Sequence, residues 1–111
     1  MDDFMKYRYG WEKFHGAIHS LASEGTFNER LANAYVFNIS HIDKENNLPE
    51  ATWNKYEELV SLLTFAEPVG NEGKVAASIA QMDDLQKNKV AELFISLYDD
   101  LCRFMPNLHK R

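Results

Sequence analysis

The sequence predicts an all-α protein, a small antiparallel helical bundle of four main helices plus one short helix. Large apolar residues recur at spacings of three and four along most of the chain, which is the period of one helix face. Helix caps, prolines and glycines separate these stretches at short intervals. Short connections favour antiparallel neighbours, so we expect successive helices to run up and down.

The first helix is expected over residues 3–24. Its apolar seam alternates spacings of three and four, in the order Phe4, Tyr7, Trp11, Phe14, Ile18 and Leu21. Gly25 follows the last turn, where glycine commonly ends a helix. Gly10 and Ala17 lie beside the seam, and their small side chains should let a neighbouring helix approach closely.

The second helix begins with a capping box. The hydroxyl of Thr26 is placed to accept from the amide of Glu29, whose side chain reaches back to Thr26. An apolar stripe then extends to Ile42 and predicts one continuous helix to that point; its members are Leu31, Ala34, Tyr35, Ile39 and Ile42. Val36 and Phe37 fall outside this stripe.

A polar loop is expected over residues 43–47, and a third helix after it. Pro49 suits the first helical position, where a missing amide proton costs nothing. The stripe of the helix contains Trp53, Tyr56, Val60 and Leu63. Pro68 should close it, because the residue before a proline avoids helical geometry.

An irregular connection is expected over residues 67–74, and a short helix over residues 75–81, with a strand as the less favoured alternative. Asp83 and Gln86 form a second capping pair. The last helix should run to about Phe104 and stop before Pro106. We therefore expect a single domain over residues 1–105 and a flexible tail over residues 106–111.

Composition and charge narrow the class of function. The chain has 111 residues, a net charge of −5 and one cysteine, and it contains no apolar run of the roughly 20 residues that cross a bilayer. Its acidic start is unlike a signal peptide, so we expect a cytoplasmic protein without a membrane partner. The densest basic patch is only Lys6, Arg8 and Lys13, which disfavours nucleic acid as a partner.

One group of residues has metal-binding spacing. Glu12, His15 and His19 lie at i, i+3 and i+7, so a helix places them on one face, where two imidazoles and a carboxylate suit zinc or iron. Di-iron bundles carry Glu-x-x-His twice, whereas this chain carries it once, and a polar flank with two ordinary histidines is the simpler interpretation. A metal-binding bundle or enzyme built on these three residues is the alternative function, with Glu57 or Glu58 as a further ligand.

Catalytic groups are otherwise scarce. Cys102 lies near the end of the last helix, where the helix dipole opposes a thiolate, so we interpret it as a buried structural cysteine. Arg103 and His109 are separated by Pro106 and cannot share a helix. We expect no catalytic residues and no cofactor, and an enzyme is the less favoured interpretation.

The aromatic content points to an interface instead. Aromatic residues make up 13% of the chain, and four large apolar residues fall off the main stripes of their helices: Met5, Tyr9, Val36 and Phe37. Such residues mark an interface when they are contiguous. The leading hypothesis is a small acidic protein that acts by protein contact, as regulators, inhibitors and immunity or antitoxin proteins do. Its partner would be another protein or a second copy, and a pocket for a small molecule between helices is a third possibility.

Overall fold

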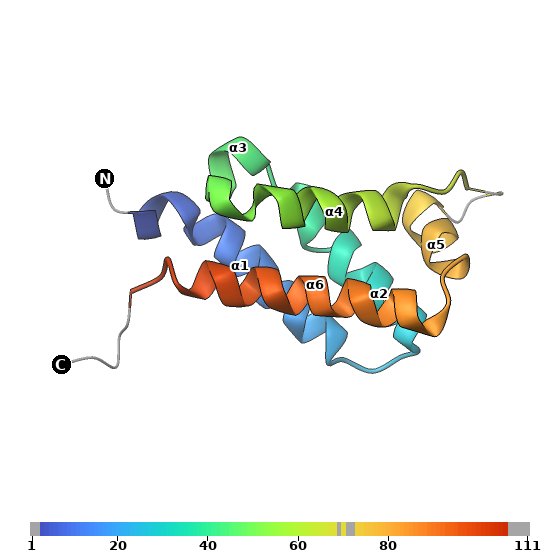
Figure 1. The fold of residues 1–111 in the computed structure, drawn as a ribbon. Coiled ribbons are helices and arrows are strands. Elements are labelled where there is room, and N and C mark those ends of the chain that lie inside the picture. Colours follow the sequence, from blue (N-terminus) through green and yellow to red (C-terminus); the bar gives the residue numbers. More distant parts are fainter. Residues whose placement is uncertain (1–2, 69, 71–72, 107–111) are drawn as a thin grey trace.

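The computed structural model describes residues 3–68, 70 and 73–106, and this part of the chain contains helices and no strand (Figure 1). Its four main helices are α1 (Asp3–Leu21), α2 (Phe27–Val36), α4 (Trp53–Thr64) and α6 (Asp84–Cys102), and the short helix α5 is Gly73–Ala80. In Figure 1, α1 and α4 run in one direction while α2 and α6 run in the other. The predicted all-α antiparallel bundle is therefore confirmed.

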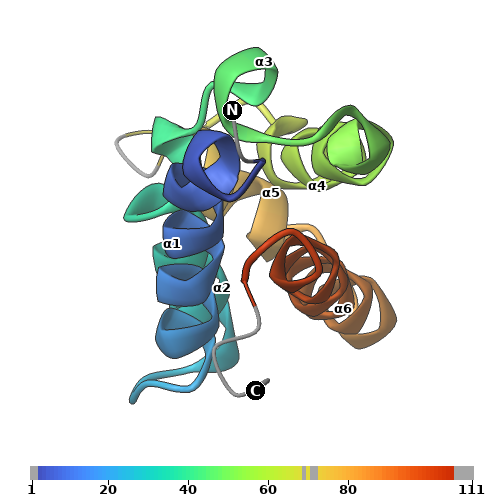
Figure 2. The ribbon, with the colours of Figure 1, turned by 90° about the vertical axis from the view of Figure 1, so that its left-hand side faces the viewer.

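Helix α1 packs against both α2 and α6, and α4 packs against α5 and α6. Figure 2 shows α1 and α2 on one side of the molecule and α4 and α6 on the other. The rings of Phe14 and Phe94 meet between α1 and α6 with centroids 6.5 Å apart. Fully buried side chains from the four main helices surround them, among them Leu31, Leu59, Leu63, Val90, Leu97 and Leu101. The apolar stripes that predicted the helices thus form one core.

The first helix stops at Leu21, three residues earlier than predicted. The guanidinium of Arg30 donates to the carbonyl of Leu21 at 2.8 Å, so a side chain satisfies this helix end. Gly25 has a φ of 117°, a conformation that favours glycine. The close approach at Gly10 is confirmed, because a methyl group there would lie 2.5 Å from the carbonyl oxygen of Asn47.

The capping box of α2 is confirmed, with Thr26 as the N-cap and Glu29 closing it. The continuous helix to Ile42 is wrong, because α2 ends at Val36 and a separate 3₁₀ turn, η1, spans Ile39–His41. Asn38 causes the break: its side-chain amide donates to the carbonyl of Ala34 at 3.1 Å, the oxygen that its own amide would use in a continuing helix.

The segment expected as a polar loop contains a single helical turn, α3 (Lys44–Asn47). The next helix opens as a 3₁₀ turn, η2 (Glu50–Thr52), so Pro49 is the residue before the first turn and not within it. Indole Nε1 of Trp53 donates to the carbonyl of Leu48 at 2.9 Å, which ties the start of α4 to this loop.

Helix α4 ends at Thr64, well before Pro68, so the predicted stop is wrong. The buried amide of Ala66 donates to the hydroxyl of Ser78 on α5 at 3.0 Å, which turns the chain out of the helix. The short helix α5 is confirmed, and so is the cap of α6 by Asp83 and Gln86. Within the described residues, no helix has the length and apolarity to cross a membrane. Residues 107–111 of the expected tail lie outside the described part.

Candidate functional site

The packing of α6 against α1 brings the two predicted histidines to a tyrosine of the opposite helix. Nδ1 of His15 lies 3.2 Å from the hydroxyl oxygen of Tyr98, and the Nε2 atoms of His15 and His19 lie 3.2 Å apart. His15 and His19 are four residues apart on α1 and therefore share one helix face. The result is a hydrogen-bonded chain from the exposed His19 inward to the α1–α6 contact.

Two further residues complete this group, which we call the α1–α6 cluster: Trp11, His15, His19, Tyr98 and Cys102. The indole of Trp11 stacks on the imidazole of His15 with centroids 5.0 Å apart and planes inclined by 18°. Its Nε1 donates to Sγ of Cys102 at 3.4 Å. Cys102 is half-buried, less than the sequence predicted, and its sulfur takes part in the packing of the cluster.

Tyr98 is the central polar residue of the cluster. Burial raises the pKa of its phenol above the ordinary value, and a hydrogen bond and charge interaction with Cys102 raise it further. The hydroxyl of Tyr98 is therefore protonated at neutral pH. A protonated phenol both donates and accepts, so it is a suitable partner for either tautomer of His15.

Glu12 pairs with Arg8 and not with the two histidines. Its carboxylate accepts from Nε of Arg8 at 3.1 Å, and both side chains are exposed, as an i, i+4 pair on the surface of α1. Among the described residues, no group of three His, Cys, Asp or Glu side chains is arranged to hold a metal ion. The predicted three-residue donor set therefore requires Glu12 to leave Arg8.

A pocket opens at one end of the α1–α6 cluster. Its volume is about 360 Å³, and its lining is Phe4, Arg8, Trp11, Met105 and Pro106. Trp11 thus belongs both to the pocket wall and to the stack on His15. The pocket is mostly aromatic and aliphatic, and the guanidinium of Arg8 is the charged group in its wall.

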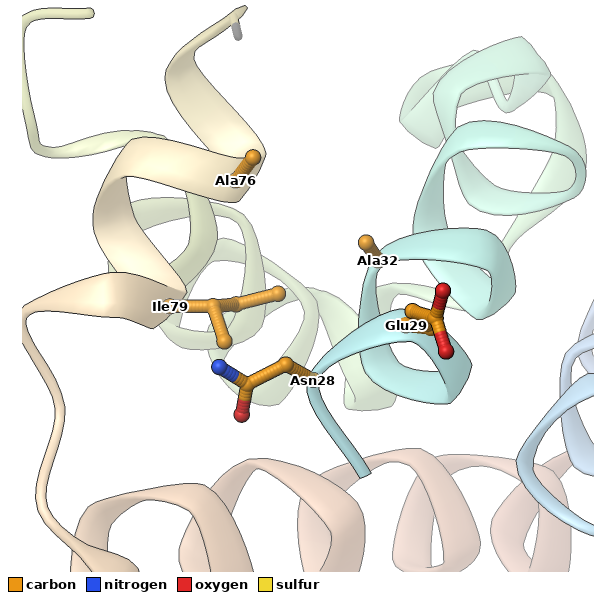
Figure 3. A pocket seen from close by; sticks show the side chains of 5 residues that line it. All are labelled: Asn28, Glu29, Ala32, Ala76 and Ile79. Atoms are coloured by element: carbon orange, nitrogen blue, oxygen red, sulfur yellow. The ribbon is translucent and has the colours of Figure 1, made fainter. Parts of the chain in front are cut away.

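A second, smaller cavity of about 200 Å³ lies between α2 and α5 (Figure 3). Ala76 and Ile79 line it from α5, and Asn28 and Ala32 line it from α2. In Figure 3, the amide of Asn28 and the side chain of Ile79 point toward each other across the gap. Glu29 also lines the cavity, but its carboxylate accepts from the amide of Thr26 at 2.8 Å and belongs to the helix cap. This cavity offers almost no polar group to a ligand.

The four predicted interface residues are all exposed. Met5, Tyr9, Val36 and Phe37 keep 62%, 41%, 44% and 65% of their surface accessible. Three more large apolar side chains are exposed that the sequence analysis did not single out, namely Phe65, Leu85 and Ile95. We call the first four the contact surface.

Met5 and Tyr9 lie on α1, and Val36 and Phe37 lie at the end of α2, which packs against α1. Gly16 lies on the same face of α1 as Tyr9, two turns later, and its backbone contacts the side chain of Asn38. Asn38 directly follows Phe37 and also donates to the hydroxyl of Ser20 at 3.3 Å. The residue after Phe37 therefore contacts α1 at Gly16 and Ser20, on the face of the helix that also carries Tyr9.

Two of the adjacent acidic pairs already have basic partners within the chain. Glu57 contacts Lys44, and Glu58 lies 3.0 Å from Lys89. Asp99 and Asp100 are bound by Arg103, and Asp100 also by Lys55 at 2.7 Å. Hydrogen bonds from these two bases lower the pKa of Asp100 although burial opposes this.

Compared with models of known protein families, with curated proteins and with solved structures, the chain matches none. Its function therefore has to be inferred from its own residues.

Proposed function

We propose that this protein is a non-catalytic binding module that acts by protein contact through the contact surface. The observation that carries the proposal is the exposure of Phe37, which keeps 65% of its surface accessible at the end of α2. Met5 and Tyr9 are further exposed apolar side chains, and they lie on α1. Exposed large side chains of this kind are the usual anchors of protein interfaces.

The charges around the contact surface favour an acidic partner. The ammonium group of Lys13 lies 5.2 Å from the ring centroid of Tyr9, and that of Lys6 lies 5.4 Å from the ring centroid of Tyr7. Neither lysine forms an ion pair with another residue of the described part. A partner with carboxylates around an apolar patch would complement both lysines.

A second copy of the chain is a poorer complement. In a two-fold symmetric dimer the same patch meets itself, so the lysine beside Tyr9 faces a patch that carries the same positive charge. Like charges that face each other across an interface cost free energy. We therefore expect the isolated protein to be a monomer and the partner to be a different protein.

The test compares three tagged proteins: the wild type, Phe37→Glu and Leu85→Glu. Leu85 is a matched control, because it is 79% exposed and lies at the start of α6, away from the contact surface. Each protein is used to capture partners from an extract of its native host, and each complex is weighed by native mass spectrometry.

A protein held stoichiometrically by the wild type and by Leu85→Glu, but not by Phe37→Glu, is the expected result. Circular dichroism should show the same thermal unfolding for all three proteins. Capture that survives Phe37→Glu would contradict the proposal. If the wild type captures a second copy of itself, and only Phe37→Glu abolishes this self-association, the partner is a second copy and not a different protein.

A further inference from the structure

The geometry of the α1–α6 cluster points to a cation site beyond the contact surface. We infer that His15 and His19 together bind one divalent transition-metal ion through their Nε2 atoms, with Tyr98 as the residue that orients His15. The two Nε2 atoms lie 3.2 Å apart. If a metal ion lay about 2.05 Å from each nitrogen, the N–metal–N angle would be about 100°, close to the angle of tetrahedral coordination. The ion replaces the hydrogen bond between the two Nε2 atoms, and each imidazole then carries its proton on Nδ1.

Tyr98 and Trp11 prepare His15 for this role. The metal-bound form needs the proton of His15 on Nδ1, and the hydroxyl oxygen of Tyr98 lies 3.2 Å from that atom and accepts it. The stacked indole of Trp11 holds the plane of the ring. Metal-binding histidines commonly donate their other N–H to such a partner, which sets the tautomer and the direction of the lone pair.

The donor set selects the class of ion. Imidazole nitrogens suit Zn²⁺, Ni²⁺ and Cu²⁺, whereas Mg²⁺ and Ca²⁺ require oxygen ligands. Glu12 is not a ligand in this site, because no three His, Cys, Asp or Glu side chains of the described residues are arranged to hold one ion and its carboxylate accepts from Arg8. Two protein ligands leave the remaining coordination positions to solvent, in keeping with the exposure of His19.

The test is isothermal titration calorimetry, in which the full chain is titrated with ZnCl₂ and, separately, with NiCl₂. One ion per chain is expected, and MgCl₂ at the same concentration should give no heat of binding. His15→Ala and His19→Ala should each weaken zinc binding more than tenfold. His41→Ala and His109→Ala are matched controls that should leave it unchanged, because neither residue belongs to the pair.

Two further variants separate this site from its rivals. Tyr98→Phe removes only the hydroxyl and should weaken zinc binding by about 10- to 100-fold, the usual effect of losing an orienting partner. Glu12→Gln should leave the affinity within about twofold of the wild type. Loss of binding in Glu12→Gln, or binding that persists in both His15→Ala and His19→Ala, would overturn the inference. Circular dichroism of each metal-free variant checks that it folds.

Discussion

At the scale of single residues, Gly10 is a position where neighbouring backbone leaves no room for a side chain. A methyl group there would lie 2.5 Å from the carbonyl oxygen of Asn47 and 2.9 Å from Cδ2 of Leu48. Gly10→Ala gains about 1 kcal/mol of helix propensity, but overpacking against backbone costs about 1–3 kcal/mol. We expect a net loss of about 1 kcal/mol in the free energy of unfolding, measured by urea denaturation.

Gly16→Ala is the matched comparison for Gly10→Ala. The atom that obstructs a methyl group at Gly16 is the side-chain oxygen of Asn38, not backbone. That side chain can rotate away, at the expense of its hydrogen bonds to Ala34 and Ser20. Gly16→Ala should therefore destabilise less than Gly10→Ala, and the reverse order would show that the contact with Asn47 is not what excludes a side chain.

Deprotonation of Tyr56 should lower the stability of the native protein at alkaline pH. Burial, with smaller contributions from the charges of Tyr35 and Asp43, raises the pKa of Tyr56 to about 12 from 10.0. The unfolded chain therefore releases this proton at a lower pH than the native chain, so native stability falls as the pH rises from about 10 to about 12. Tyr56→Phe should flatten this decline in urea denaturation between pH 9 and 11. If the free energy of unfolding fell equally steeply with pH in the wild type and in Tyr56→Phe, the decline would not come from Tyr56. The difference in stability between the two proteins at pH 7 is the reference for this comparison.

At the scale of elements, the interiors of the helices follow from the sequence but several of their ends do not. The stripe around Phe14 predicted α1, because a repeat of three and four residues specifies one buried face. Caps encoded locally, as at Thr26 and Asp83, were also predicted correctly. The end of α2 was not, because it depends on where Asn38 meets α1 after folding.

The same limit applies to the candidate site. His15 and His19 share a helix face and could be recognised by their spacing, and the exposure of Phe37 followed from its place off the stripe. Tyr98 lies 83 residues from His15 in the chain, so only the packing of α6 on α1 brings it into the site. Nothing local to Tyr98 distinguishes it from a residue beside the core.

The junction of α4 and α5 rests on one buried hydrogen bond. Ser78 is fully buried and accepts from the amide of Ala66 at 3.0 Å. Ser78→Ala leaves that buried amide without a partner, so we expect a loss of about 1–3 kcal/mol in the free energy of unfolding. Ser61→Ala, at an exposed position of α4, is the control and should stay within about 0.5 kcal/mol of the wild type. Equal effects of the two substitutions in urea denaturation would mean that water replaces the lost partner.

At the scale of the whole molecule, α1 serves two sides of the protein. Its flank toward α6 carries His15 and His19, and its outer face carries Met5 and Tyr9. Met5 and His15 are ten residues apart, about 15 Å along the helix axis. Met5 and the proposed metal site therefore lie at different points along one helix, which packs against α2 and α6.

This separation predicts that the two binding events are independent. Coupling between sites is reciprocal, so an ion that does not change the affinity for the partner cannot have its own affinity changed by the partner. Phe37→Glu should bind zinc within about twofold of the wild type, and His15→Ala should capture the same partner in the same amount with or without zinc. Both are measured on the proteins already described, by calorimetry and by native mass spectrometry. Capture that changes when zinc is added to the wild type, but not to His15→Ala, would mean that the metal site lies within the interface, and that the contact surface extends from Phe37 around α1 to the α1–α6 cluster.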